Sequence, residues 1–215
     1  SDWILRSFVD QAHVNGLFEM AKRLIDILGG LVGTILTALV APFIVLTILL
    51  DSGRPILFFQ KRLGQNGREY DIIKFRTMRT DAEAKGASWA TKEDPRVTRL
   101  GRFMRKTRID ELPQAINVLI GDMSMIGPRP ERPQFFSKLE TSIPLYIERT
   151  YGILPGITGL AQVRQGYDET VEDVRNKVGW DHAYAARIDS FWSWLKTDLS
   201  IAFETVSVMV RGRGQ

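Results

Sequence analysis

The longest apolar stretch of the chain covers residues 24–50, where Asp26, near the start, is the only charged residue. A helix of this length would extend about 40 Å, enough to cross a bilayer core of about 30 Å. Globular helices rarely stay apolar on all sides over such a length, so we expect a membrane segment rather than a buried core helix. A secretory signal is disfavoured, because the apolar run is too long and no small-residue cleavage site follows it.

Pro42 interrupts this segment and is expected to bend it, because proline removes a backbone hydrogen bond and clashes with a carbonyl of the preceding turn. The parts on either side, residues 31–41 and 43–50, are each too short to cross a bilayer alone. Basic residues flank both ends of the run, namely Lys22, Arg23, Arg54, Lys61 and Arg62. Basic flanks on both sides favour a re-entrant helix pair that returns to the same membrane face. A kinked helix that spans the bilayer is the alternative.

Short polar and basic elements follow the apolar segment. Residues 54–78 predict two strands joined by a turn at Gln65-Asn66-Gly67, which is a hairpin pattern. Residues 79–98 are small, charged and broken by Pro95, so we expect a mobile loop. A short helix is predicted over residues 98–104.

The next part of the chain predicts further helices around a proline-rich turn. Apolar residues at helical spacing predict a helix that begins near Asp110, and they are Leu112, Ile116, Leu119 and Ile120. The sequence GPRPERP at residues 127–133 predicts a turn. Another helix is expected over residues 132–149, followed by loop and strand over residues 151–167.

Residues 180–210 combine helical spacing of apolar residues with Trp180, Trp192 and Trp194. Tryptophan favours the headgroup level of a bilayer, so we predict an amphipathic helix at the membrane interface. A terminal helix that packs on the protein core is the alternative. At the other end, the sequence begins with Ser1 rather than Met. We therefore expect residues 1–20 to be an amphipathic segment or the remnant of an upstream region.

The composition narrows the possible chemistry. The 215 residues suit one domain and contain no cysteine, which excludes disulfides and thiol catalysis. Only two histidines occur, far apart, so a zinc site or a Ser-His-Asp triad is poorly supported and carboxylates are the candidates for proton transfer. The formal net charge of +4 favours anionic partners, which could be nucleic acid, acidic lipid or phosphorylated small molecules.

Asp110 and Glu111 lie side by side in the sequence RIDELPQ and allow two interpretations. Asp is a favoured N-cap residue, Glu suits the first turn, and proline is tolerated there, so the pair could simply start a helix. Alternatively, two adjacent carboxylates could bind Mg²⁺ together with substrate phosphate oxygens, and an aspartate can attack phosphorus. The interpretations are compatible, because a cap holds its side chain in a fixed place.

Basic residues surround this pair in the sequence. They precede it at Arg102, Arg105, Lys106 and Arg108, occur on the predicted hairpin at Lys61, Arg62, Lys74 and Arg76, and follow at Arg129 and Arg132. The planar guanidinium of arginine matches phosphate oxygens, and Arg129 is held between two prolines. Any one of these charges could belong to a solvated face, but together they indicate phosphate chemistry at a bilayer surface. No P-loop or GxGxxG motif is present.

The sequence resembles the bacterial sugar transferases, or monotopic phosphoglycosyl transferases, over about residues 20–210. The motifs that carry the resemblance are PILFFQKRLGQNG, IIKFRTM, RKTRIDELPQAINVLIGDMSMIGPRPE and LPGITGLAQVRQG. The resemblance implies a helix-rich α/β monotopic domain with a small β-hairpin and amphipathic interfacial helices. Its re-entrant membrane helix would cover residues 21–52, broken at Pro42. A catalytic domain over residues 53–215 would lie on the cytoplasmic face of the bacterial inner membrane. Many members have Ser before that proline, where this chain has Ala41.

The resemblance also implies an activity and its partners. Such enzymes transfer a sugar 1-phosphate from a UDP-sugar to polyprenyl phosphate, release UMP and require Mg²⁺. They act in exopolysaccharide, capsule or O-antigen assembly. Membrane lipid, downstream glycosyltransferases and a second copy of the chain would be partners, and nucleic acid would not.

Site residues follow from the positions of the motifs. Asp110 would be the nucleophile that forms a covalent phospho-sugar intermediate, and Glu111 would help it by binding Mg²⁺ or deprotonating the acceptor. Phosphate or nucleotide contacts would come from the basic residues Arg105, Arg129, Lys61, Arg62, Lys74, Arg76 and Arg164.

Two further functions remain as alternatives. One is a membrane-tethered module that binds nucleic acid or anionic lipid without chemistry, and the other is an inactive scaffold for glycan-assembly partners. The intact Asp110-Glu111 pair argues against the scaffold.

Overall fold

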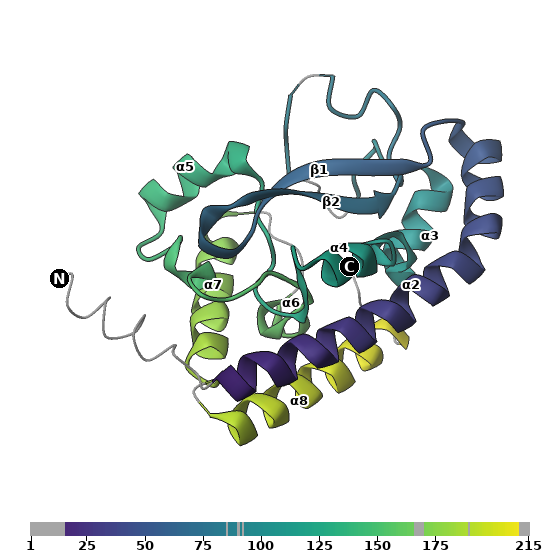
Figure 1. Ribbon diagram of the computed structural model, residues 1–215. Helices are drawn as coiled ribbons and strands as arrows, with labels where there is room; N and C mark the ends of the chain where they lie inside the picture. The colour runs from purple at the N-terminus through teal and green to yellow at the C-terminus, as the bar shows by residue number, and fades with distance from the viewer. Residues whose placement is uncertain are drawn as a thin grey trace.

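A computed structural model describes residues 16–210, with the exception of residues 85, 90, 92, 166–169 and 189. The predicted N-terminal segment therefore lies largely outside the described residues. Two long helices, α2 (Gly16–Ser52) and α8 (Phe191–Val210), line the lower edge of the molecule in Figure 1. A β-hairpin covers the opposite side, and the short helices α4 (Gln114–Ile120) and α6 (Leu160–Arg164) lie between them, while α5 (Pro133–Ser142) lies beside the hairpin.

The apolar segment forms most of the helix α2, which has 37 residues and contains Pro42. Its ribbon changes direction in its C-terminal part, as Figure 1 shows, so the expected bend is present although the helix is not interrupted. Residues Phe18–Ser52 are long and apolar enough to cross a membrane, and only 11% of their most apolar window is buried. The interpretation as a buried core helix is therefore wrong.

After the bend, one face of α2 packs on the rest of the protein. Ile48 is 1% exposed and forms an apolar cluster with Phe75 and Met104. Ala41 and Ile44 are partly buried against this cluster. The bend thus brings the C-terminal part of α2 against the elements that follow it in sequence.

The helix α4 (Gln114–Ile120) packs on a glycine-lined face of α2. A Cβ atom added at Gly33 would lie 2.8 Å from the Cβ of Ala115. The two helices can therefore approach this closely only because Gly33 has no side chain. Arg23 fastens the end of α4, because its guanidinium donates to the carbonyls of Val118 and Leu119 at 2.7 Å each. These carbonyls belong to the last turn of α4, where carbonyls lack the usual partner four residues on and favour a cation.

Two other charged residues of α2 bind the core rather than solvent. Asp26 is 3% exposed and accepts hydrogen bonds from the Ser124 hydroxyl at 2.9 Å and the Met125 amide at 2.8 Å. Lys22 forms an ion pair with Asp198 of α8 at 3.0 Å. Lys22 and Arg23, expected to be a basic flank, are therefore internal anchors of the fold.

The predicted hairpin is confirmed. Strands β1 (Leu57–Leu63) and β2 (Glu69–Phe75) pair antiparallel with Leu57 opposite Phe75, and the 3₁₀ turn η1 (Gln65–Gly67) connects them. Tyr70 and Ile72 of β2 are buried with residues of α4 and the segment after it. The hairpin therefore covers α4 on the side opposite α2.

The predicted helix at residues 98–104 is confirmed as α3 (Arg99–Thr107). The hydroxyl of Thr98 caps its start by accepting from the amide of Gly101. Gly101 lies against the backbone of Thr77, where an added Cβ would overlap the Thr77 carbonyl. This contact sets the position of α3 beside β2.

The C-terminal half forms a second, short sheet and four helices. The three-residue strands β3 (Ser124–Ile126) and β4 (Gly156–Thr158) pair in parallel. The helix predicted over residues 132–149 is shorter than expected, because α5 ends at Ser142 and a 3₁₀ turn occupies part of the rest. The elements are α5 (Pro133–Ser142), η3 (Glu148–Thr150), α6 (Leu160–Arg164), α7 (Val171–Ala185) and α8.

The tryptophan-rich tail is divided between α7 and α8. In α8, Trp194 is 1% exposed and packs edge-to-face against Phe18 of α2 at 4.9 Å, whereas Trp192 is 77% exposed. Leu199 and Phe203 of α8 are also exposed. The helix is thus docked on the core by one face, and the other face presents the apolar side chains expected of an interfacial helix.

The contact of α3 with Thr77 predicts opposite effects for the same substitution in two helices. Gly101→Ala forces a Cβ into the Thr77 backbone and is expected to lower the free energy of unfolding by at least about 2 kcal/mol. Gly179→Ala in α7 meets open space and is expected to raise it by up to about 1 kcal/mol, because alanine is the better helix former. Thermal unfolding of the detergent-solubilised variants measures both changes. Equal stability of the two variants would contradict the close approach.

Candidate active site

The carboxylate pair lies in a tight turn between two helices. Arg108 adopts a left-handed conformation (φ 56°) that ends α3, and the 3₁₀ turn η2 (Ile109–Glu111) follows. This conformation is energetically unfavourable for a residue other than glycine, and such strain is often found at functional sites. Helix α4 begins later, after Pro113, and Asp110 makes no capping hydrogen bond. The interpretation of Asp110 as a helix cap is therefore wrong.

This turn opens into a cavity of about 460 Å³. One wall carries the acidic pair, Asp110 and Glu111, and cations from several segments. The cations are Lys74, Arg105, Arg108 and Arg129. The remaining wall comes from the loop after β2, the turn after β3, and helices α6 and α7. The cavity therefore combines a compact cationic region with room for a larger ligand.

Glu111 is 8% exposed and is surrounded by three cations. Its carboxylate lies 2.7 Å from Lys74 Nζ, 3.2 Å from Arg108 and 3.6 Å from Arg129. Burial alone would raise the pKa of Glu111, but these charges outweigh burial and hold the pKa well below its usual range. Glu111 is consequently an ionised anchor for the cationic wall.

Asp110 has a different environment, although it is 6% exposed. Among the described residues, none donates a hydrogen bond to its carboxylate, and Asp110 is one of the residues that line the cavity. Burial and the neighbouring charge of Glu111 raise the pKa of Asp110 to about 6, and Lys74 partly offsets them. The carboxylate is thus desolvated, available and still ionised at neutral pH, as a nucleophile toward phosphorus requires.

Three further predicted phosphate-binding residues line the cavity. Arg105 is held by a hydrogen bond from Nε to the Thr77 hydroxyl at 2.9 Å. Arg62 donates to the Pro130 carbonyl at 3.0 Å and thereby supports the proline-rich turn. Arg76 directs its guanidinium to the Ser52 carbonyl at 2.9 Å, so it fastens the C-terminal end of α2. Arg62 and Arg76 are therefore bound to protein groups, whereas Arg105 keeps terminal nitrogens for a ligand.

Two predicted residues are not brought to this cavity. Lys61 points away from it and forms an exposed ion pair with Asp71 at 3.1 Å. Arg164 forms an ion pair with Glu204 of α8 at 3.1 Å. Neither belongs to the described residues that line the cavity. The prediction that both contact phosphate is therefore not supported by their positions.

Of the two carboxylates, Asp110 is better suited than Glu111 to bind the expected Mg²⁺ ion. Within the described ranges, no cluster of three or more His, Cys, Asp or Glu side chains forms a protein-only metal site. Mg²⁺ usually takes only one or two carboxylates and completes its shell with water and substrate phosphate oxygens. Asp110 has unengaged oxygens and fits this role, while both Glu111 oxygens already face cations.

A buried ion pair behind the proline-rich turn was not predicted. Arg149 and Asp181 lie 2.8 Å apart and are almost completely buried. Arg149 also donates to the backbone carbonyl of Arg129 at 3.1 Å. This pair fixes the turn that carries Arg129. No sequence signal connects the two residues, because they lie on η3 and α7 and meet only in the fold.

Comparisons with known proteins identify relatives of this chain. The family model described as bacterial sugar transferase matches residues 17–212. The UDP-N-acetylgalactosamine-undecaprenyl-phosphate N-acetylgalactosaminephosphotransferase of Aeromonas hydrophila is 40% identical over 214 residues, which cover 96% of this chain and 49% of that protein. The UDP-glucose:undecaprenyl-phosphate glucose-1-phosphate transferase of Caulobacter vibrioides is 42% identical over 194 residues, 87% of this chain and 69% of that protein. The chain thus spans about half the length of the Aeromonas relative.

The charge arrangement predicts how the acidic pair titrates when a cation is removed. Lys74→Met is expected to raise the apparent pKa of Asp110 above about 6, by about one unit or more, because Lys74 lowers the pKa of both carboxyls. Lys61→Met, on the same hairpin but outside the cavity, is expected to leave these values unchanged. Carboxyl ¹³C NMR titration of the detergent-solubilised protein reports the shifts. The same titration curve in both variants would refute the proposed coupling.

Proposed function

The chain belongs to the bacterial sugar transferase family, and on this premise we propose that it transfers a sugar 1-phosphate from a UDP-sugar to polyprenyl phosphate, with release of UMP. The observation that carries the proposal is Asp110, a buried carboxylate beside a wall of cations that receives no hydrogen bond from the residues that the structure describes. The names of the Aeromonas and Caulobacter relatives support it, since they combine UDP-sugars with undecaprenyl phosphate. The product would enter polysaccharide assembly at the cytoplasmic membrane face.

The reaction would proceed in two displacements at phosphorus. An oxygen of Asp110 attacks the β-phosphorus of the donor, and the bond to the bridging oxygen breaks, so that UMP leaves and an aspartyl phospho-sugar forms. A phosphate oxygen of the lipid then attacks the same phosphorus and releases the Asp110 carboxylate. The lipid diphosphate sugar is the product. Both steps develop negative charge on phosphate oxygens, which Arg105, Arg108 and Arg129 are placed to stabilise.

Glu111 would act mainly through the cations that it holds. Its three ion pairs leave it a poor proton acceptor, because the pKa lies well below its usual range. A bound Mg²⁺ would supply charge neutralisation for the leaving UMP, and Asp110 together with donor oxygens would hold it. Glu111 would join the metal only by releasing one of its cations.

The contacts of α2 support a re-entrant membrane anchor. Near its start, Arg23 binds the end of α4, and at its end, Ser52 accepts from Arg76. Both ends of the apolar helix are therefore held by the same catalytic domain. A helix that crossed the bilayer fully would place its ends on opposite sides, about 30 Å apart across the hydrocarbon core. We therefore propose that α2 enters and leaves the membrane on one face, with its bend inside.

The covalent step predicts the effect of removing the nucleophile. Asp110→Asn keeps the shape of the side chain but cannot form the acyl phosphate, so the rate of UMP release is expected to fall by at least about a thousandfold. Asp71→Asn is the matched control, because Asp71 is exposed outside the cavity, and full activity is expected. The assay uses purified protein, Mg²⁺, a panel of UDP-sugars and polyprenyl phosphate, and mass spectrometry locates trapped sugar phosphate on Asp110.

Two results of this assay would contradict the proposal. Normal turnover by Asp110→Asn would exclude the covalent mechanism and is what a binding module without chemistry would show. No transfer by the wild-type protein with any UDP-sugar would exclude the enzyme itself.

The topology predicts which engineered cysteines react from the same side. The chain contains no cysteine, so Glu19→Cys, Arg54→Cys and Glu140→Cys each give a single exposed thiol. In sealed vesicles all three are expected to react with an impermeant maleimide from one side. Leu39→Cys, in the apolar part of α2, is expected to stay unlabelled. Reaction of positions 19 and 54 from opposite sides would establish a span instead.

A further inference from the structure

The segment between β2 and α3 forms part of the cavity wall although it has little regular structure. A bridge between Met78 and Val97 closes the loop at its base. Ala82, Glu83, Ser88 and Trp89 from this loop line the cavity. In Figure 1 the loop extends from the side of the hairpin that faces away from α8. Something other than a sheet or helix must therefore fix its shape.

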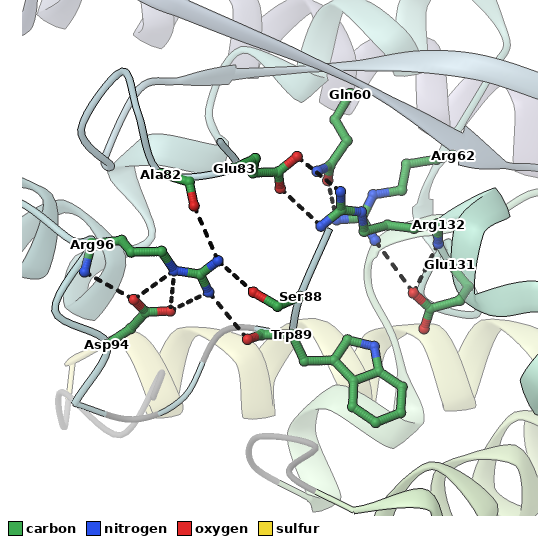
Figure 2. Close-up of polar contacts among 10 residues, drawn as sticks. All are labelled: Gln60, Arg62, Ala82, Glu83, Ser88, Trp89, Asp94, Arg96, Glu131 and Arg132. Carbon is green, nitrogen blue, oxygen red and sulfur yellow. Dashed lines mark hydrogen bonds and ion pairs between the residues drawn. The ribbon is translucent and has the colours of Figure 1, made fainter. Parts of the chain in front are cut away.

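Arg96 supplies this organisation with one guanidinium group, as Figure 2 shows. It binds the Asp94 carboxylate through two nitrogens at 2.6 and 2.9 Å. On its other side it donates to the Ser88 hydroxyl and to the carbonyls of Ala82 at 3.4 Å and Trp89 at 3.2 Å. The planar fork thus joins both sides of the loop at once, which a lysine cannot do.

A second contact ties the same loop to the proline-rich turn. Glu83 forms a two-point ion pair with Arg132 at 2.9 and 3.0 Å. Arg132 is 7% exposed and follows Glu131, whose carboxylate lies 3.9 Å from Arg62 (Figure 2). The loop is thereby connected to the turn that also carries Arg129. Its position relative to the cationic wall is consequently fixed.

A third contact is apolar. The indole of Trp89 packs against Phe135 of α5 at 5.2 Å and belongs to the cluster between α5 and α7. Its carbonyl is held by Arg96. Ser88 and Trp89 therefore form a wall of the cavity whose position is fixed. Arg96 holds this wall from within the loop, and the aromatic cluster holds it from outside.

We propose that Arg96 is a positioning residue for the UDP-sugar donor, because it holds the loop wall at Ser88 and Trp89 against the part of the donor outside the diphosphate. This inference rests on the proposed function. The donor is soluble and reaches the cavity from the aqueous side, where the loop lies. The polyprenyl chain would stay with the apolar surfaces of α8 and of the N-terminal part of α2, which lie on the other side of the molecule in Figure 1. The effect of Arg96 therefore falls on the donor and not on the acceptor.

The split between kinetic constants separates this role from a general structural one. Arg96→Lys keeps the charge but loses the fork, and the KM for the UDP-sugar is expected to rise on the order of tenfold. We expect kcat and the KM for polyprenyl phosphate to stay within about twofold, since Asp110 and its cations are untouched. Arg175→Lys is the matched control, because Arg175 forms an exposed ion pair with Glu172 away from the cavity. All its constants are expected to match the wild type.

Asp94→Asn tests the pair of Arg96 and Asp94 by changing the residue that holds Arg96. Arg96 lowers the pKa of Asp94 to about 2 through their hydrogen bonds, so the carboxylate is ionised when it holds Arg96. Asp94→Asn is expected to raise the donor KM as well, and the double variant with Arg96→Lys should add little further, because the pair acts as one unit. Thermal unfolding of each variant checks that the fold is retained.

The outcomes distinguish the two proposals. An unchanged donor KM in a folded Arg96→Lys protein overturns the role of Arg96, and so does an equal rise in the KM for polyprenyl phosphate. A loss of kcat with a lowered melting temperature also overturns it and assigns Arg96 to stability. Failure of the wild-type and Arg175→Lys proteins to transfer sugar would instead contradict the proposed function.

Discussion

The site depends on the neutralisation of one buried carboxylate by three cations. Glu111 draws Lys74 from β2, Arg108 from the left-handed turn and Arg129 from the proline-rich turn to within 2.7–3.6 Å. Burying an unpaired carboxylate costs several kcal/mol, so these segments are held together wherever Glu111 is ionised. The same arrangement leaves Asp110, the adjacent residue, without a hydrogen-bond donor of its own among the described residues. One carboxylate is therefore spent on organising charge, and the other stays available for chemistry.

Helix α4 transmits this arrangement to the membrane helix. It begins three residues after Glu111, lies on the glycine face of α2 and has its last carbonyls bound by Arg23. Asp26 of α2 then holds the start of β3, which leads into the proline-rich turn with Arg129. The positions of the acidic pair and of Arg129 thus both depend on contacts with the first half of α2. A shift of α2 relative to the core would move both sides of the cationic wall.

Local signals in the sequence were sufficient for the elements that depend on local interactions. The long apolar run, the hairpin turn at Gln65–Gly67 and the short helix over residues 98–104 were each predicted from the sequence, and the structure contains all three elements. The apolar spacing in α4 was misleading, because Ile116 and Ile120 are exposed, whereas Ala115 and Val118 are buried. The buried face is set by the glycines of α2, some eighty positions away in the sequence, and no local pattern contains that information.

The direction of the basic side chains was equally hidden from the sequence. Lys61 and Arg62 are neighbours on one strand, and successive side chains point to opposite faces, so only one of them can line the cavity. The register that selects Arg62 comes from pairing with β2. The three-residue strands β3 and β4 and the ion pair of Arg149 with Asp181 also arise from contacts between distant segments. The motifs located Asp110 and Arg129, but the supports behind them are properties of the fold.

In the proposed reaction the cationic wall of the cavity would serve two ligands of different solubility, and a covalent step would suit this architecture. The loop organised by Arg96 borders the cavity, while α8 and the N-terminal part of α2 lie on the other side of the molecule in Figure 1. If donor and acceptor had to bind together, four phosphate-type charges or more would compete for the same arginines. Storing the sugar phosphate on Asp110, as proposed, would let UMP leave before the lipid phosphate approaches. The arginines that stabilise the first displacement would then be free to stabilise the second, and Glu111 would keep them in place between the two.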